Sequence, residues 1–361
     1  MIVPIIRLLF TLFYRMIMRR DCVLALFFTF ILVGCVSEQI EILQNRTFAE
    51  VQQIAVKKKQ NFCIVLLDTT DLTSKIYMER LNHESLEAVF NIIDMNLHQN
   101  EWYAQWLYSN STPVTCIFTP VGELIDVIPG ASRKCFYCME QVIKDSKMCM
   151  DLNYYNSFSL EKETLIPLLN DVFQCNRELQ QGNDISEQID VLSNVISYPY
   201  VLYLKMENLA KHDKLELAQL VATQLLGLDL EDVWKQEICP DLLIAAKKML
   251  DSDYDVRLEP QLECDKVIEL DNCEIGKPKL FEIKVMNSGV TSLEIQEIQL
   301  SCSCVALIGD EHYTILPGES QHVKFQFTID KNEEVEREIL LKSNGIYSVH
   351  SCLLYTSPSP R

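Results

Sequence analysis

The 361-residue sequence is poor in the residues that most catalytic and nucleotide-binding motifs require. It has 10 glycines and 6 histidines, and it contains no glycine-rich phosphate loop, no Ser/His/Asp motif and no HExxH-type metal motif. The histidines, at positions 83, 98, 212, 312, 322 and 350, do not have metal-ligand spacing. With 32 basic against 51 acidic residues, the chain also lacks the basic surface that nucleic-acid binding needs. We therefore expect no cofactor, no metal and no nucleic-acid partner.

The composition is that of an ordinary globular protein, with 48% hydrophobic and 23% charged residues. The chain is long enough for two or three domains. The 14 cysteines are too sparse for a miniprotein built on disulfides. Charge is unevenly distributed: the first 34 residues hold four arginines and one acid, whereas the residues from 36 onward hold 28 basic and 50 acidic side chains.

The N-terminal segment has the pattern of an export signal. Arg19-Arg20 precedes an apolar run from Cys22 to Val33, which is too short for the roughly 20 residues that span a bilayer. Its end, Leu32-Val33-Gly34-Cys35, resembles a bacterial lipobox. The resemblance implies a signal peptide over 1–35 and a lipid such as palmitate on Cys35, with the protein anchored in the cell envelope facing the periplasm, at the outer membrane. The alternative is a retained membrane anchor within residues 1–34.

The pattern of residues 36–150 predicts alternating helices and strands. A capping box at Thr47 to Glu50 starts a helix to about Lys59, and apolar or periodic runs predict the elements that follow. They are strands over 62–67, 89–97, 114–118 and 124–128 and helices over 74–81, 101–108 and 132–144. This order, with Thr112-Pro113 before a strand pair, resembles the thioredoxin fold over 45–147. The resemblance implies that Pro113 is cis and borders a peptide-binding site.

The redox motif of that family is missing where it is expected. The aligned quartet is Asp71 to Ser74, which has no thiol, and dithiol exchange needs an attacking thiolate. A Cys-x-x-Cys occurs instead at Cys135 and Cys138 in the last helix. Two interpretations remain: Cys135 and Cys138 are packed thiols, or they form a relocated redox or metal pair. Packing is favoured because no basic residue or helix start is expected to activate them.

Residues 151–255 read as an all-α connector, with helices over 160–179, 186–196, 198–210, 215–226, 228–234 and 240–250. The pair at 198–226 resembles one tetratricopeptide-type hairpin, with Ala218 and Ala222 allowing close helix approach. A solenoid needs about three such units, and no clean second copy is present. A plain connector and a peptide-holding groove both remain possible.

Residues 256–350 read as a β-sandwich, because their strands alternate apolar and polar residues between turn signals. The series Asn287-Ser288-Gly289, Ser301-Cys302-Ser303-Cys304 and Leu316-Pro317-Gly318-Glu319 is similar to an immunoglobulin-like bacterial family of unknown function, over 265–349. Ser303 departs from the family's usual glycine. Residues 351–361 do not continue the strand pattern, and we interpret them as a non-native tail that leaves the last strand truncated near His350.

Cys302 and Cys304 are placed by this pattern on one face of a strand. They could bind a soft metal with His312 or His322, pair with Cys273, or pack as thiols. A lone Cys-x-Cys is a weak metal signal, because structural zinc takes four ligands.

The sequence therefore predicts a multidomain protein: a thioredoxin-like α/β domain, an all-α connector and an immunoglobulin-like sandwich. The favoured function is a non-catalytic envelope lipoprotein that binds another protein or peptide. The alternatives are a thiol–disulfide oxidoreductase using Cys135 and Cys138, and a metal-holding sandwich at Cys302 and Cys304.

Overall fold

The computed structural model describes residues 40–152, 158, 160–228, 238–331 and 335–358. The export signal with Cys35 and most of the helix expected over 228–234 lie outside these residues. Among the described residues, no helix is both long and apolar enough to cross a membrane.

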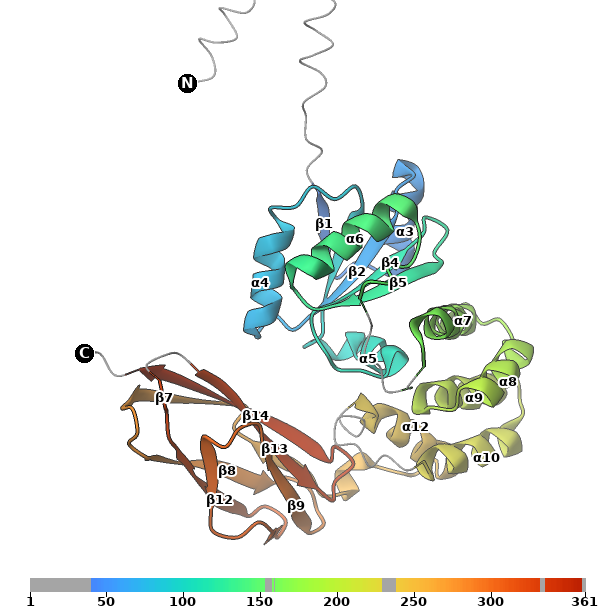
Figure 1. Cartoon of the computed structure of the whole chain (residues 1–361). Helices are drawn as coiled ribbons and strands as arrows, with labels where there is room; N and C mark the ends of the chain where they lie inside the picture. Colours follow the sequence, from blue (N-terminus) through green and yellow to red (C-terminus); the bar gives the residue numbers. More distant parts are fainter. Residues whose placement is uncertain (1–39, 153–157, 159, 229–237, 332–334, 359–361) are drawn as a thin grey trace, which may run out of the picture.

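The N-terminal part is a five-stranded sheet covered by helices on both faces (Figure 1). The strand order is β1-β3-β2-β4-β5, with β1, β3 and β2 parallel and β4 and β5 antiparallel to their neighbours. The central strand β2 is FCIVLL, buried along its whole length, as its uninterrupted apolar run predicted. The elements are β1 (Glu41–Gln44), α3 (Phe48–Lys58), β2 (Phe62–Leu67), α4 (Leu72–Leu81), β3 (Val89–Asp94), η1 (His98–Asn100), α5 (Trp102–Leu107), β4 (Val114–Phe118), β5 (Leu124–Pro129) and α6 (Arg133–Asp145).

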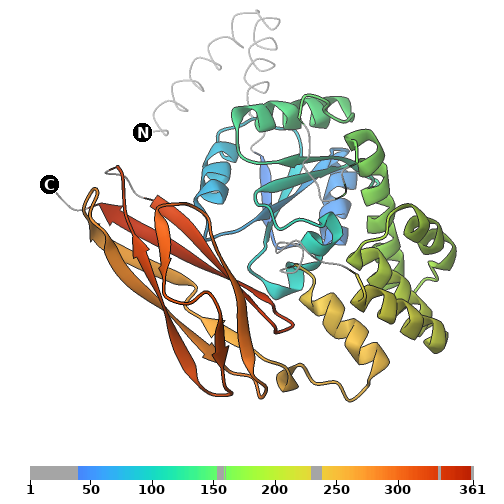
Figure 2. The ribbon, with the colours of Figure 1, turned by 60° about the horizontal axis from the view of Figure 1, so that its bottom comes forward.

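The next part is helical and packs against the sheet (Figures 1 and 2). Its helices are α7 (Lys162–Gln180), α8 (Ser186–Val195), α9 (Pro199–Lys211), α10 (Leu215–Leu226) and α12 (Pro240–Leu250). The expected division at residue 150 is not a division of the core, because buried side chains of α7 to α12 belong to the same cluster as one face of the sheet. The opposite face packs against α4 and α6.

Aromatic side chains form the centre of this shared core. The Phe173 ring of α7 lies 4.9 Å from Phe48, 5.2 Å from Phe118 and 4.8 Å from Trp106, measured between ring centroids. The Trp106 indole N–H donates to the Leu169 carbonyl at 2.8 Å, and the Tyr198 hydroxyl donates to the Trp106 carbonyl at 2.9 Å. Tilted aromatic pairs of this kind add to the free energy of apolar burial. The helices are therefore an extension of the α/β fold and not a free-standing connector.

The C-terminal part is a sandwich of two sheets. A four-stranded sheet has the order β10-β12-β8-β6 and a five-stranded sheet has the order β11-β9-β13-β14-β7. The elements are η2 (Val256–Leu258), β6 (Leu262–Cys264), β7 (Val267–Cys273), β8 (Lys279–Asn287), β9 (Leu293–Leu300), β10 (Val305–Ile308), β11 (Tyr313–Ile315), β12 (Ser320–Phe327), β13 (Val335–Ser343) and β14 (Val349–Pro358).

The end of the chain differs from the sequence-based expectation. Residues 351–358 continue β14, which pairs with β13 on one side and with β7 on the other. The prediction of a strand that stops near His350 and leaves an exposed edge is therefore wrong. The short apolar run Cys352-Leu353-Leu354 was too brief to stand out as a strand, but Cys352 and Leu354 are fully buried in the sandwich core.

The turn at Asn287 to Gly289 fixes how the chain enters the sandwich. The buried Asn287 amide donates to the carbonyls of Thr291 and Ile315, at 2.8 and 2.9 Å. A Cβ on Gly289 would lie 2.2 Å from the Glu259 carbonyl oxygen, so glycine is required for the close passage of the chain before β6. Ser303 does not have a positive φ, so serine is accommodated there without backbone strain.

A buried ion pair joins the start of α7 to the sheet. The Lys162 ammonium at the start of α7 lies 2.6 Å from an Asp126 carboxylate oxygen on β5, and both side chains are almost completely excluded from solvent. Asp126 also accepts from the backbone N–H groups of Val127 and Cys149, and Lys162 donates to the Cys149 and Leu152 carbonyls. Every charge in this group therefore has partners, which burial requires.

We expect Lys162→Met to lower the free energy of unfolding by about 3–5 kcal/mol, because it leaves the Asp126 carboxylate buried without a counter-charge. Urea denaturation followed by circular dichroism measures the change. The double variant Asp126→Asn/Lys162→Met should recover much of the loss. Lys277→Met removes an exposed ion pair with Glu274 and should have no measurable effect; equal losses for Lys162→Met and Lys277→Met would contradict the assignment.

Candidate functional site

Asp71 and Ser74, where the sequence predicted a degenerate redox site, form a helix cap. Asp71 is the N-cap of α4, and its carboxylate accepts from the Ser74 backbone N–H at 2.8 Å and from the Ser74 hydroxyl at 2.6 Å. The Ser74 hydroxyl oxygen in turn accepts from the Asp68 backbone N–H at 3.2 Å. An N-cap of this kind satisfies backbone donors that the first helical turn leaves open. Asp71 and Ser74 thus serve the local fold and offer no nucleophilic thiol.

A second acidic residue, Asp68, lies just beyond β2 and is held in its charged form. Its carboxylate accepts from the Thr70 N–H and hydroxyl, at 2.7 and 2.6 Å, and from the Asn96 amide at 2.8 Å. Burial raises the pKa of Asp68, but the hydrogen bonds from Thr70 and Asn96 outweigh it, so the pKa lies below its ordinary value. The carboxyl end of β2 therefore carries a fixed negative charge.

Thr112 and Pro113 lie beside this cap. The peptide bond between them is cis, and the Thr112 hydroxyl donates to an Asp71 carboxylate oxygen at 3.2 Å. Asp71 therefore contacts both Ser74 and Thr112, so the structure brings together the residues that the sequence placed at the degenerate redox site and at the Pro113 site.

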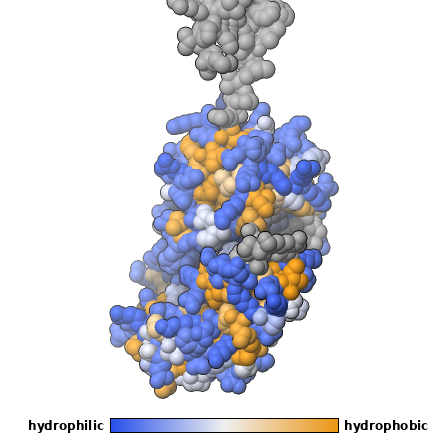
Figure 3. Space-filling model, turned by 90° about the vertical axis from the view of Figure 1, so that its left-hand side faces the viewer, coloured by the Kyte–Doolittle hydropathy of each residue, from blue (hydrophilic) through white to orange (hydrophobic). Residues whose placement is uncertain are grey.

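A cleft of about 1850 Å³ opens from this point. One wall is formed by residues that follow β2 and β3, together with Ser111 and Thr112; the other wall is formed by β6, β7, β13 and β14 of the sandwich. The surface viewed from the side of α4 and the sandwich is hydrophilic over most of its area, with separate apolar patches (Figure 3). The cleft therefore lies between the α/β part and the sandwich, where strands of both sheets line it.

The lining of the cleft is strongly acidic. It includes two lysines, Lys75 and Lys266, against seven carboxylates. The acids come from both walls: Asp68, Glu101, Glu263, Glu269, Asp271, Glu336 and Glu338. Carboxylates that face one another across a cleft create a negative potential that attracts cationic groups.

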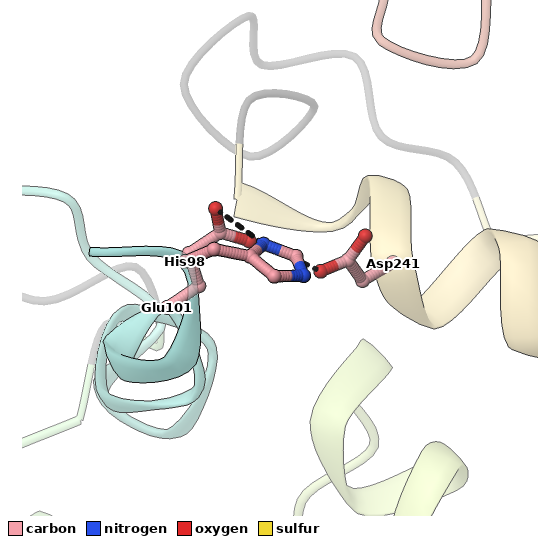
Figure 4. Close-up of side chains that lie close together, drawn as sticks. All are labelled: His98, Glu101 and Asp241. Atoms are coloured by element: carbon pink, nitrogen blue, oxygen red, sulfur yellow. Dashed lines mark ion pairs between the residues drawn. The ribbon is translucent and has the colours of Figure 1, made fainter. Parts of the chain in front are cut away.

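The three parts of the chain meet at one end of the cleft. His98 of η1 lies between two carboxylates (Figure 4), with its Nδ1 atom 3.0 Å from a Glu101 oxygen and 3.7 Å from an Asp241 oxygen. Asp241 belongs to the first turn of α12, and it also accepts from the Tyr347 hydroxyl of the sandwich at 3.4 Å. Asp241 therefore links the α/β part to the sandwich through the helical part.

His98, Glu101 and Asp241 are also the group of the described residues that could hold a metal ion. One ligand atom from each lies within 4.8 Å of the others, and an imidazole with two carboxylates suits a divalent cation such as zinc. The His98 side chain is 76% exposed, and His98 already pairs with both carboxylates, so the arrangement is a junction of ion pairs.

Cys135 and Cys138 are buried in the core between α6 and the sheet. The expectation that no helix start lies near them is wrong, because α6 begins at Arg133 and the Cys135 N–H donates to the N-cap Ser132. The Cys135 thiol nevertheless contacts the Pro129 carbonyl oxygen at 3.0 Å. Burial raises the pKa of Cys138 to about 12, which leaves little thiolate at neutral pH. Both features count against a solvent-facing redox pair.

The sandwich cysteines do not form the expected set. Cys302 and Cys304 lie in the turn between β9 and β10, not on one face of a strand, and they are joined by a disulfide. Neither is therefore a thiolate ligand for a metal. Cys273 is a separate buried thiol that contacts the Leu270 carbonyl. His312 is exposed, and His322 is on β12 beside Glu282, at 3.1 Å.

Sequence reasoning missed the junction and the acidic cleft. Asp241 is far from His98 in the sequence, and acidic residues are too frequent in this chain for one of them to signal a partner. A weak signal was present at His98 and Glu101, whose spacing of three residues places them on the same side of a helical turn.

We expect the pKa of His98 to lie above its ordinary value, because the hydrogen bond and charge of Glu101, followed by the charge of Asp241, favour the imidazolium. A titration of the imidazole signals by NMR measures it. Glu101→Gln should lower this pKa more than Asp241→Asn, and Asp253→Asn should leave it unchanged. Because the pKa is raised, the ion pairs at the junction are complete below the unfolded-state pKa and are lost as the pH rises through the folded-state pKa. A His98 pKa that neither Glu101→Gln nor Asp241→Asn lowers would contradict the junction.

Comparison with known proteins identifies the C-terminal part. Residues 260–354, about a quarter of the chain, match the family described as the HYDIN/CFA65/VesB-like immunoglobulin-like domain. No protein in the curated set matches the chain significantly.

The solved structures that resemble the chain do so over a similar fraction of its length. A protein of unknown function from Porphyromonas gingivalis W83 is 12% identical, with a TM-score of 0.26, over 30% of this chain and 50% of its own. A PapD-like domain of human CEP192 is 9% identical, with a TM-score of 0.26, over 30% of this chain and 91% of its own. The VesB protease of Vibrio cholerae is 15% identical, with a TM-score of 0.24, over 28% of this chain and 32% of its own. The chain thus spans half the length of the first of these proteins, and its residues 260–354 form an immunoglobulin-like domain.

Proposed function

We propose that this chain is a non-catalytic binding protein that holds a segment of another polypeptide in the acidic cleft. The observation that carries the proposal is the composition of the two walls. One wall includes Thr69, Thr70 and Thr112, which offer hydrogen-bonding groups and no thiol. The other wall includes β7, the edge strand of the five-stranded sheet.

An edge strand supports this function because its outer backbone groups can pair with an added strand. Val267, Glu269 and Asp271 alternate along β7, so their side chains share one face, and all three line the cleft. An extended segment that pairs with β7 would place its own side chains opposite Asp68 and Glu101. The excess of carboxylates favours a partner segment that is rich in lysine or arginine.

The α/β part is proposed to be a thioredoxin-like domain without redox activity. The support is the strand order with its mixed directions, the pairs of helices on the two faces, and the cis bond before Pro113. The Asp71–Ser74 cap occupies the position of the dithiol. Burial of Cys135 and Cys138 gives the alternative oxidoreductase function no support.

The protein is further proposed to be a bacterial envelope lipoprotein, anchored in the outer membrane through Cys35 and facing the periplasm. This part rests on the sequence alone: the basic n-region, the short apolar run and Leu32-Val33-Gly34-Cys35.

Lipid attachment is tested by growing an expressing bacterium with an alkyne analogue of palmitate. We expect label on the wild-type chain and none on Cys35→Ser, because the Cys35 thiol is the acceptor of the lipid. Cys22→Ser is the matched control and should keep the label, since Cys22 lies inside the apolar run. Label that survives in Cys35→Ser would reject the anchor.

Binding in the cleft is tested with two fluorescent ten-residue peptides, one rich in lysine and one rich in glutamate. We expect the basic peptide to bind more tightly by fluorescence anisotropy and its affinity to fall as salt is raised, because the cleft charge is screened. Reversal of two lining charges, Glu269→Lys/Glu336→Lys, should weaken binding roughly tenfold, which is about 1.4 kcal/mol.

The matched control is Glu311→Lys, an exposed acid of the sandwich outside the cleft, which should leave the affinity unchanged. A photo-crosslinker at position 70, on the cleft wall, should react with the bound peptide, whereas one at the exposed position 280 should not. Equal binding of both peptides, or equal loss in the cleft variant and the control, would refute the cleft as the binding site.

A further inference from the structure

Two buried cysteines outside the cleft are in unusually close contact. The sulfur of Cys138, in α6, lies 2.7 Å from the sulfur of Cys149, which follows the helix. Both are free thiols in the structure, and this separation is shorter than an ordinary contact between unbonded sulfurs. A disulfide needs a further closure to about 2.05 Å. The contact thus places both sulfurs close to bonding distance.

The position of Cys149 is fixed by the buried ion pair. Its backbone N–H donates to Asp126 at 2.8 Å, and its carbonyl accepts from the Lys162 ammonium at 2.8 Å. The chain reaches this position because Ser146, the C-cap of α6, has a left-handed conformation that turns the backbone away from the helix axis. The Cys149 side chain is therefore held against α6 by contacts that do not depend on either sulfur.

Cys135 is not an alternative partner in this arrangement. Its thiol contacts the Pro129 carbonyl and the Ser132 hydroxyl, each at 3.0 Å. We propose that Cys138 and Cys149 form a disulfide that fastens the segment after α6 to that helix. The Cys-x-x-Cys spacing of Cys135 and Cys138 does not indicate this pairing.

Formation of the bond needs a disulfide-class oxidant, for which glutathione disulfide is the probe. The Cys149 thiol loses its proton, and its thiolate attacks the oxidant; a mixed disulfide forms and one glutathione thiol leaves. The Cys138 thiolate then attacks the Cys149 sulfur and releases the second glutathione. Two S–H bonds are replaced by one S–S bond, and the oxidant takes up two electrons and two protons as two thiols.

Accessibility sets the order of these steps. Cys149 is 8% exposed and its neighbours Met150 and Asp151 are exposed, whereas Cys138 is completely buried. Burial raises the pKa of the Cys138 thiol to about 12, so its attack on the mixed disulfide is slow in the folded chain. The same burial shields the finished bond from reductants.

The test is a tryptic map of the full chain after incubation with glutathione disulfide, with free thiols blocked in denaturant. Trypsin cleaves at Lys144 and Lys147, between the two cysteines, so a disulfide keeps the peptides 135–144 and 148–162 together until reduction. We expect this linked pair in the wild type. Two separate peptides, both alkylated without prior reduction, would overturn the proposal.

Single substitutions assign the bond, because Cys135 and Cys138 lie in the same tryptic peptide. Cys135→Ser should keep the linked pair, and Cys138→Ser should lose it; the reverse result would overturn the assignment. The melting temperature gives a second measurement. Oxidation should raise it by roughly 5–10 °C more in the wild type than in Cys149→Ser, which retains the Cys302–Cys304 bond. The same rise in both proteins would show that Cys138 and Cys149 are not joined.

Discussion

The structure depends most on the buried pair of Asp126 and Lys162. A charge in a protein interior is tolerated only when its partners are in place, and here the partners come from β5, from the start of α7 and from the backbone at Cys149. Three segments must therefore assemble together for either charge to be satisfied. This requirement specifies where α7 begins on the sheet, and the Phe173 ring then completes the aromatic core that the helices share with α3, α5 and β4.

That shared core also explains why the cleft has a firm wall. The loops after β2 and β3 carry Asp68, Asp71 and Asn96, which are joined to neighbouring groups by short hydrogen bonds. Below them, β2 is buried on both faces by α4 and α6 on one side and by α3 and the later helices on the other. The acidic groups are thus presented from the carboxyl end of a buried strand.

The sequence predicted local elements well and distant pairings poorly. The apolar run at Phe62–Leu67 and the capping box at Thr47 act through neighbouring residues, so the sequence pattern alone predicts a strand and a helix start there. The predicted bounds of α10 and α12 are those of the structure. Asp126 and Lys162 carry no such signal, because nothing local distinguishes a charge that becomes buried. The same holds for Cys138 and Cys149, whose contact depends on a turn at Ser146. It holds also for β14, because Leu353 pairs with Val267 of β7, far away in the sequence. The immunoglobulin-like domain was recognisable from its turns, whereas the cleft arises only when that domain is placed beside the α/β part.

Asp241 gives the cleft a mechanical property. The residue contacts His98 of the α/β part and Tyr347 of the sandwich, and it lies in the first turn of α12, which is packed against α10 and α9. α12 therefore acts as a spacer whose position determines how far apart the walls stand. The width of the cleft is then set by the packing of α12, so a change in that packing would alter the width without altering the carboxylates on the walls.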